Sequence, residues 1–153
     1  MLIYLGADHG GFNLKERVKN FLLEQGYEVD DLGNAAYDSA DDYPDFGAAV
    51  AEAVSKDPEG SRGILFCRSG VGMDVVANKF PRVRAALGIS PDHVYSARHD
   101  DDVNVLSLAA DFIEDPPYAE KMIEVFLSTP FGAEERYKRR LKKIADAEEG
   151  LRE

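Results

Sequence analysis

Residues 63–72 read Gly-Ile-Leu-Phe-Cys-Arg-Ser-Gly-Val-Gly, and they contain the only cysteine of this 153-residue chain. The short apolar run 64–66, preceded by glycine, is typical of a buried parallel strand rather than of a helix. Cys67 would then stand at the carboxyl end of the strand, where ligands bind in open α/β sheets. This stretch therefore predicts a parallel sheet and a ligand site at its edge.

Strand and helix patterns alternate along the rest of the chain. Short apolar segments predict five strands, at 2–5, 27–29, 64–66, 83–87 and 104–108. Apolar residues at helical spacing predict helices that cover 14–22, begin near 44, cover 73–79, begin at 90–91, cover 118–128 and run from 133 onward. The acidic stretch 30–42 is expected to be a loop. Strands separated by helices in this way predict one α/β domain over residues 1–153, with a doubly wound parallel sheet.

The composition narrows the class of protein further. A formal net charge of −11 works against general binding to nucleic acid or to an anionic membrane. A single cysteine excludes an internal disulfide and fits a reducing compartment. The sequence shows no apolar stretch near the length of a membrane span and no signal-peptide pattern at its start. We therefore expect a cytoplasmic protein that acts on a small molecule.

The loop that follows the central strand carries groups suited to catalysis. A thiol and a hydroxyl among free backbone amides can supply a base and an oxyanion site. The alternative is a buried cysteine that only fills space. Spacing excludes three other loop classes, because Met73 stands where a tyrosine-phosphatase loop needs arginine, Val75 stands at the third glycine of a dinucleotide fingerprint, and the Walker A ending is absent. The loop amides and the start of the next helix can still bind phosphate.

Other polar residues are expected at the same edge of the sheet. Asp8 and His9 follow the first strand and precede two glycines, which allow a ligand to approach the backbone. Asp42 and Tyr43 precede the second helix. His9 alone would more often be a loop histidine without a task. Its place at a strand end beside Asp8 favours a role in binding.

The final helix is basic in an otherwise acidic chain. Residues 134–143 contain six of the eighteen lysines and arginines. Arg136 and Arg140 lie one helical turn apart and could clamp a phosphate, for which the guanidinium fork is suited. The alternative is a solvated basic face next to an apolar stripe that includes Tyr137.

These pieces together match a known family. The motifs, in order, are Gly6-Ala7-Asp8-His9-Gly10-Gly11-Phe12, Asp42-Tyr43-Pro44, Cys67-x-Ser69-Gly70-x-Gly72, Ala77-Asn78-Lys79-Phe80, Asn104-Val105-Leu106 and Arg136-x3-Arg140. Over almost its whole length the chain resembles the type B ribose-5-phosphate isomerases and the related galactose-6-phosphate isomerase subunits. The resemblance implies a Rossmann-like three-layer α/β/α sandwich with a five-stranded parallel sheet.

The resemblance also implies a reaction and its participants. The expected activity is an aldose–ketose isomerisation of ribose 5-phosphate and ribulose 5-phosphate that uses no metal and no cofactor. Cys67 matches the family's proton-abstracting cysteine. Ser69, with loop amides near Gly70 and Gly72, matches the group that stabilises the enediolate intermediate.

The remaining expected site residues bind the substrate. Asp8 and Tyr43 match residues that line the sugar site. His9, Arg136 and Arg140 match phosphate ligands. Family active sites form between two subunits, and the arginines come from the partner. The resemblance thus implies a homodimer or a dimer of dimers with shared active sites.

Three departures from the family pattern affect the expected site. The family commonly carries His-Asn-Asp-x-Asn-Val-Leu, with the histidine credited with opening the sugar ring. Counting back from Asn104 places Asp100 at the histidine position and Asp101 at the asparagine, whereas His99 lies one residue early. Either His99 or Asp100 is therefore expected to open the ring, and Asp101 is grouped with the substrate-binding residues.

The other two departures exchange charges at the site. Arg68 stands where the family usually has glycine, and we count it as a substrate-binding residue. Asp111 stands where the family often has a further arginine. These changes leave open another substrate, such as a tetrose or hexose phosphate, or a non-catalytic sugar-phosphate-binding subunit. A metal site at His93, His99 and residues 100–102 is disfavoured, because histidines six residues apart on a helix are poorly aligned.

Overall fold

The computed structural model describes residues 1–150, and its centre is a parallel sheet in the strand order β2-β1-β3-β5-β4. Every pair of neighbouring strands is parallel. This confirms the predicted five-stranded parallel sheet. The strands are β1 (Leu2–Ala7), β2 (Glu28–Asp31), β3 (Ser61–Cys67), β4 (Ala85–Leu87) and β5 (Val105–Ala109).

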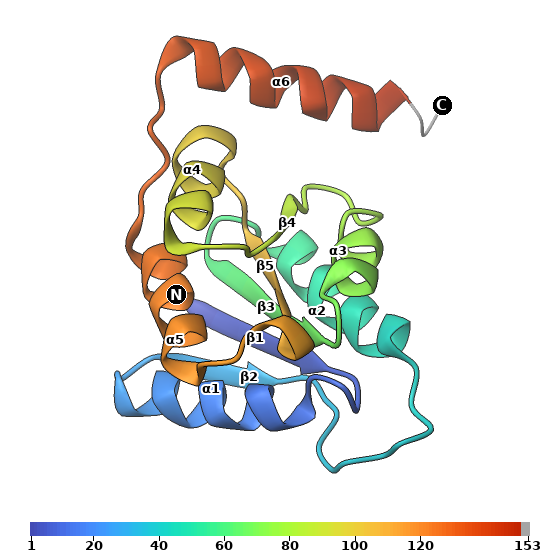
Figure 1. Ribbon diagram of the computed structural model, residues 1–153. Coiled ribbons are helices and arrows are strands. Elements are labelled where there is room, and N and C mark those ends of the chain that lie inside the picture. The colour runs from blue at the N-terminus through green and yellow to red at the C-terminus, as the bar shows by residue number, and fades with distance from the viewer. Residues whose placement is uncertain (151–153) are drawn as a thin grey trace.

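Helices cover both faces of the sheet and give the three layers that the resemblance implied (Figure 1). One buried core joins the sheet to α1, α4 and α5, and a second joins it to α2 and α3. The helices are α1 (Phe12–Glu24), α2 (Tyr43–Lys56), α3 (Val71–Ala77), α4 (Pro91–Asp101), α5 (Pro116–Ser128) and α6 (Glu135–Gly150), with the short 3₁₀ helix η1 (Ala110–Phe112) after β5.

Side-chain alternation along β3 decides where the cysteine points. Ile64 and Phe66 belong to the core beneath α1 and α5, whereas Leu65 and Cys67 belong to the core beneath α2 and α3. Successive residues of a strand face opposite sides, so this division follows from the strand itself. Cys67 therefore ends β3 on the side of the sheet that α2 and α3 cover.

Several element boundaries differ from those predicted, and three of them have a visible structural reason. Strand β2 continues to Asp31, because Asp30 and Asp31, which were predicted to begin the acidic loop, pair with Tyr4 and Leu5 of β1. Strand β4 begins at Ala85 rather than at residue 83, where its pairing with β5 starts. Helix α6 begins at Glu135, two residues late, because Ala133 has a positive φ of 54°. The sequence predicted this helix from residue 133 onward without a defined end, and the part of that prediction that falls on residues 151–153 lies outside the described residues.

Helix α6 lies at the opposite end of the sheet from the Cys67 turn. It packs against α4, and the Arg82 amide donates to Glu148 near its end. Figure 1 shows α6 beyond α4, away from the end of the sheet at which β3 and β5 finish. Among residues 1–150, no helix has the length and apolar character needed to cross a membrane.

Candidate active site

The Cys67 turn is a tightly packed structure at the carboxyl end of β3. The buried Cys67 Sγ accepts a hydrogen bond from the Gly70 amide at 3.2 Å. Gly70 has a positive φ of 72°, and a Cβ there would lie 2.4 Å from Leu87 Cδ1. The Ser107 hydroxyl donates to the Gly70 carbonyl at 2.6 Å. Glycine is therefore required here both by the backbone conformation and by the space available.

Two further predicted residues lie at this turn. Ser69 is exposed, and its Oγ accepts from the Val71 amide at 3.3 Å. A Cβ on Gly72 would lie 2.7 Å from the ring of Tyr43, so the first residue of α2 contacts the start of α3. The thiol, the hydroxyl, the loop glycines and Tyr43 are thus neighbours, as the sequence predicted.

The turn after β1 packs directly against this loop. Asp8 is buried, and its Oδ1 accepts from the Gly11 amide at 3.1 Å. A Cβ on Gly10 would lie 2.4 Å from Cγ of Arg68, and a Cβ on Gly11 would lie equally close to the Phe66 carbonyl. The absence of side chains at these two glycines lets the β1 and β3 turns touch. Asp8 and Arg68 therefore belong to one group with Cys67.

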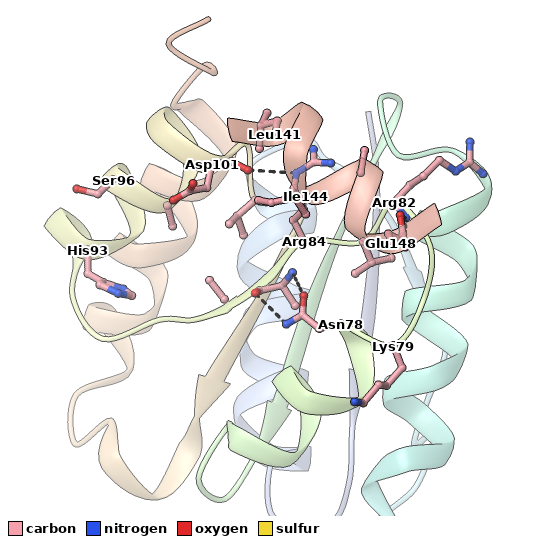
Figure 2. A pocket seen from close by; sticks show the side chains of 16 residues that line it. Asn78, Lys79, Arg82, Arg84, His93, Ser96, Asp101, Leu141, Ile144 and Glu148 are labelled. Carbon is pink, nitrogen blue, oxygen red and sulfur yellow. Dashed lines mark hydrogen bonds between the residues drawn. The ribbon is translucent and has the colours of Figure 1, made fainter. Parts of the chain in front are cut away.

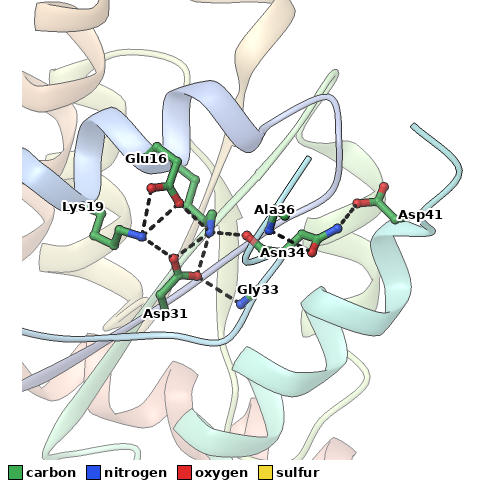
Figure 3. Close-up of polar contacts among 8 residues, drawn as sticks. Glu16, Lys19, Asp31, Gly33, Asn34, Ala36 and Asp41 are labelled. Carbon is green, nitrogen blue, oxygen red and sulfur yellow. Dashed lines mark hydrogen bonds and ion pairs between the residues drawn. The ribbon is translucent and has the colours of Figure 1, made fainter. Parts of the chain in front are cut away.

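His9 is held by a carboxylate that the sequence did not single out. Asp41 Oδ1 accepts from the His9 amide at 2.9 Å and lies 2.7 Å from His9 Nδ1. Asp41 Oδ2 accepts from Asn34 Nδ2 at 3.0 Å (Figure 3). The hydrogen bond that the His9 ring makes to the Asp41 carboxylate raises the pKa of His9, with smaller contributions from the charges of Asp8 and Asp41. His9 therefore retains its positive charge to a higher pH than an ordinary histidine does.

The loop that carries Asp41 is anchored by a buried cation. Lys15 is wholly buried, and its Nζ donates to both carboxylate oxygens of Asp31 and to the Asn34 carbonyl at 2.7–2.8 Å. Lys19 adds a second ion pair to Asp31, and Glu16 pairs with both lysines. Figure 3 shows Glu16, Lys19 and Asp31 on one side of Asn34 and Asp41 on the other. Burial alone would raise the pKa of Asp31, but hydrogen bonds from the two lysines lower it.

Arg68 and Asp111, whose charges depart from the family pattern, lie beside each other at this edge of the sheet. Arg68 Nη1 is 3.8 Å from Asp111 Oδ2, and the Asp111 amide donates to the Arg68 carbonyl at 3.0 Å. Both side chains are more than half exposed, at 65% and 51%. An exposed pair of this kind contributes little to stability. The Arg68 guanidinium is therefore accessible to solvent at this edge of the sheet while it lies near Asp111.

A second group of predicted residues surrounds His99 near the end of α4. His99 Nδ1 is 2.8 Å from Asp100 Oδ1. The His99 ring stacks on Tyr95 at a centroid distance of 5.3 Å and meets Tyr137 edge-on at 5.6 Å. The hydrogen bond with His99 lowers the pKa of Asp100. His99 and Asp100, which were predicted as alternatives for one position, thus lie in hydrogen-bonding contact with each other.

Tyr137 joins this pair to the arginines of α6. It is buried, and its hydroxyl accepts from Arg136 Nη2 at 2.8 Å. The Arg136 and Arg140 guanidinium carbons lie 4.7 and 5.9 Å from the centre of its ring. Burial raises the pKa of this phenol. The sequence analysis placed Tyr137 only in an apolar stripe and did not predict that it belongs to this group. Its position directly after Arg136 was the one feature of the sequence that could have indicated this.

Asp101 lies apart from this pair. Its side chain is exposed, and its carbonyl accepts from Arg84 Nε at 3.1 Å. It lines a cleft of about 830 Å³ between α6, α4 and the segment that leads into β4. Figure 2 shows Leu141 and Ile144 of α6 above Asn78 and Arg84 in this cleft. Cys67 and Tyr43 are not among its lining residues, so this cleft is distinct from the Cys67 turn.

The sheet separates the two groups within one chain. Cys67 pairs with Ala109 at the carboxyl end of β5, whereas His99 and Asp100 precede Val105, where β5 begins. The four steps from Val105 to Ala109 span about 13 Å along the strand. The Cys67 turn and the His99 group therefore cannot meet around one small molecule in a single chain.

The fold and the Cys67 turn define a class of protein. A Rossmann-like sheet with a thiol, a hydroxyl and backbone amides in one turn at its carboxyl edge is the arrangement of an α/β enzyme with a cysteine in its active site. Residues 3–144 match the model of the family described as Ribose/Galactose Isomerase. The chain belongs to this family.

Individual relatives are similar to this chain over nearly its full length. The ribose-5-phosphate isomerase B of Mycobacterium tuberculosis is 36% identical over 148 residues, which cover 97% of this chain and 90% of the relative. A crystal structure of ribose-5-phosphate isomerase B from Mycoplasma genitalium, with bound ribulose-5-phosphate, has a TM-score of 0.93 and 37% identity, over 97% of this chain and 96% of that one. The enzyme from Clostridium thermocellum has the same TM-score at 36% identity, over 99% of both chains.

Proposed function

We propose that this protein is an aldose–ketose isomerase that interconverts ribose 5-phosphate and ribulose 5-phosphate without a metal or a cofactor. The observation that carries the proposal is the contact between Cys67 Sγ and the Gly70 amide at the carboxyl edge of the sheet. A related chain of the same fold holds ribulose-5-phosphate in its crystal structure. Family membership and this turn together support the same reaction.

The proposed chemistry begins with proton abstraction. The Cys67 thiolate removes the C2 proton of the open-chain aldose, and the electron pair forms the C1–C2 double bond of an enediolate with negative charge on O1. The Cys67 thiol returns the proton to C1 while the O2 proton is transferred to O1, which gives the ketose and restores the thiolate. A hydrogen bond donated by Gly70 to Sγ stabilises negative charge on sulfur, and Ser69 with the loop amides can donate to the enediolate oxygens.

The phosphate group is proposed to bind between two chains. His9 and Arg68 supply positive charge beside Cys67, and Arg136 and Arg140 supply it at the opposite end of the chain. Because the sheet holds the two groups apart, a complete site requires the His99 group of a second copy. A homodimer with shared active sites is the smallest assembly that meets this requirement.

The pair formed by His99 and Asp100 is proposed to open the sugar ring. Ring opening needs a proton removed from the anomeric hydroxyl and another delivered to the ring oxygen. With Nδ1 bonded to Asp100, His99 has Nε2 available for this transfer. Although His99 lies one residue before the position of the family's ring-opening histidine, it then still opens the ring, and Asp100 orients it.

The experiment that tests this proposal has two parts. First, the protein is assayed on four-, five- and six-carbon aldose phosphates, and ribose 5-phosphate should give the highest kcat/KM. Cys67→Ser should remove nearly all turnover, because a serine hydroxyl is far too weak an acid to supply the base. A preference for another carbon count would identify a different substrate, and no turnover of any substrate would indicate a binding subunit.

The second part tests whether the site is shared. Heterodimers of Cys67→Ser with the double variant His99→Ala/Arg140→Ala, isolated by two affinity tags, should recover about half of native activity, because one of the two sites then carries no substitution. The matched control pairs Cys67→Ser with Ser69→Ala, which lie in the same half-site, and should recover none. Equal activity in the two heterodimers would contradict a shared site.

A further inference from the structure

We propose that Asp41 is a positioning residue that fixes the tautomer, orientation and charge of His9, so that His9 Nε2 donates to the phosphate group of the substrate. This inference rests on the proposed function for the identity of the substrate. Its structural basis, the contact between Asp41 and His9, is independent of that function. The family resemblance implied a role in phosphate binding for His9, whereas Asp41 had no predicted role.

The geometry ties His9 to Asp41 at two points. One carboxylate oxygen of Asp41 accepts from the His9 backbone amide at 2.9 Å and lies 2.7 Å from the ring Nδ1. The two residues are 32 positions apart, so the contact joins the β1 turn to the acidic loop. Because the carboxylate of Asp41 accepts from Nδ1, Nε2 is the ring nitrogen left for a ligand, and it donates to that ligand when the ring is protonated.

Asp41 is itself fixed by the anchored loop. Its second oxygen accepts from Asn34 Nδ2, and the Asn34 carbonyl accepts from the buried Lys15 ammonium at 2.7 Å. The Asp41 side chain is only 6% exposed, in contrast to the other acidic residues of this loop. The hydrogen bonds therefore run from an ion pair inside the protein through Asn34 to Asp41 (Figure 3). Asp41 in turn contacts the His9 ring.

The charges around His9 favour its protonated form. Asp41 and Asp8 both raise the pKa of His9, whereas burial and the nearby Arg68 lower it. Tyr37 meets the ring edge-on at a centroid distance of 6.5 Å. Burial alone would raise the pKa of Asp41, but hydrogen bonds from Asn34 and His9 lower it. Asp41 therefore favours its own ionised form and the protonated form of His9, although Arg68 lies nearby.

The same side chains could also be viewed as ligands of a cation, because Asp8, His9 and Asp41 place one ligand atom each within 4.8 Å of one another. Two observations explain the cluster without an ion. Asp8 Oδ1 already accepts the Gly11 amide, and His9 Nδ1 is engaged by Asp41. The experiment therefore includes assays with and without a chelator and added Mg²⁺ or Zn²⁺.

The test substitutes Asp41→Asn, which keeps the shape of the side chain and removes its charge. At pH 7.5 the KM for ribose 5-phosphate and the Kd for inorganic phosphate should rise about tenfold, with kcat changed less than about twofold. An NMR titration of the three histidines should show a lower pKa for His9 in the variant. Below both pKa values His9 is protonated in either protein, so the ratio of phosphate affinities should shrink as the pH falls.

The matched control is Asp38→Asn, a carboxylate of the same loop that is exposed and accepts only from the Ala40 amide. It should leave the KM and the His9 pKa unchanged. In a His9→Ala background, Asp41→Asn should have no further effect on KM. If Asp41→Asn lowers thermal stability but does not move the His9 pKa, its role is structural and the proposal fails. Activity that a chelator removes would also overturn it, in favour of a cation site.

Failure of this inference can be told apart from failure of the proposed function. If the protein does not isomerise ribose 5-phosphate, yet Asp41→Asn lowers the His9 pKa and weakens binding of inorganic phosphate, Asp41 still positions His9. If the native protein isomerises ribose 5-phosphate and neither His9→Ala nor Asp41→Asn changes its KM, the function stands and the positioning role is refuted.

Discussion

The Gly70→Ala substitution tests the packing of the Cys67 turn and its chemistry together. Gly70 has a φ of 72°, in the left-handed region that costs an L-residue about 1–2 kcal/mol. The new methyl group would lie 2.4 Å from Leu87 Cδ1 and 3.2 Å from the Ala109 backbone nitrogen. Leu87 can move, but the nitrogen of β5 cannot, and overpacking of this kind costs about 1–3 kcal/mol. Together these effects predict a loss of about 2–5 kcal/mol in unfolding free energy.

Gly26→Ala is the control that separates strain from crowding. Gly26 has a similar φ of 83°, but a Cβ there meets no atom within 4 Å. Gly26→Ala should lose only the unfolding free energy that the left-handed backbone conformation costs an alanine. This loss is partly offset, because alanine also lowers the entropy of the unfolded chain. For a chain of this length, each kcal/mol corresponds to about 2–4 °C in Tm. Gly70→Ala should therefore melt several degrees below Gly26→Ala.

The activity of the two variants completes the test. Gly26→Ala should keep native kcat/KM, whereas Gly70→Ala should lose at least about tenfold, because the backbone that donates to Cys67 Sγ is displaced. Unfolding is followed by calorimetry, and activity is measured on ribose 5-phosphate well below the Tm. Equal Tm values for the two variants would refute the predicted crowding. A destabilised Gly70→Ala variant with native kcat/KM would show that this amide takes no part in the reaction.

Two further pairs of substitutions test the second half of the site. Arg140→Ala should weaken binding of inorganic phosphate about tenfold or more, the effect of losing one charge-assisted hydrogen bond. The control is Lys138→Ala, which removes a cation paired with a neighbouring glutamate on the other side of α6 and should have little effect. Equal phosphate affinity in the two variants would show that the basic face of α6 is only solvated. His99→Ala should slow turnover of ribose 5-phosphate more than Asp100→Ala does, and neither substitution should change the turnover of an acyclic tetrose phosphate in kinetic assays. A large loss of turnover on both substrates would exclude a role in ring opening.

Local patterns were enough to predict most of the fold. Short apolar segments identified the five strands, and apolar residues at helical spacing identified the helices on both faces. The exact bounds of the elements were predicted less well, for example at the edge strands β2 and β4. There, partner strands and side-chain contacts decide the boundary: Asp31 reads as a loop residue until Lys15 pairs with it and β1 lies beside it.

The sequence by itself determined the order of the elements and the chemical character of each strand end, because strand and helix periods, glycine positions and charges are local properties. It also brought Cys67, Ser69 and Tyr43 to one edge, since the carboxyl ends of parallel strands share an edge. Only the tertiary structure decided that Asp41 meets His9, that Tyr137 meets His99, and that the sheet separates Cys67 from His99. These relations join residues far apart in the chain, and they depend on strand order and loop path, which no local propensity specifies.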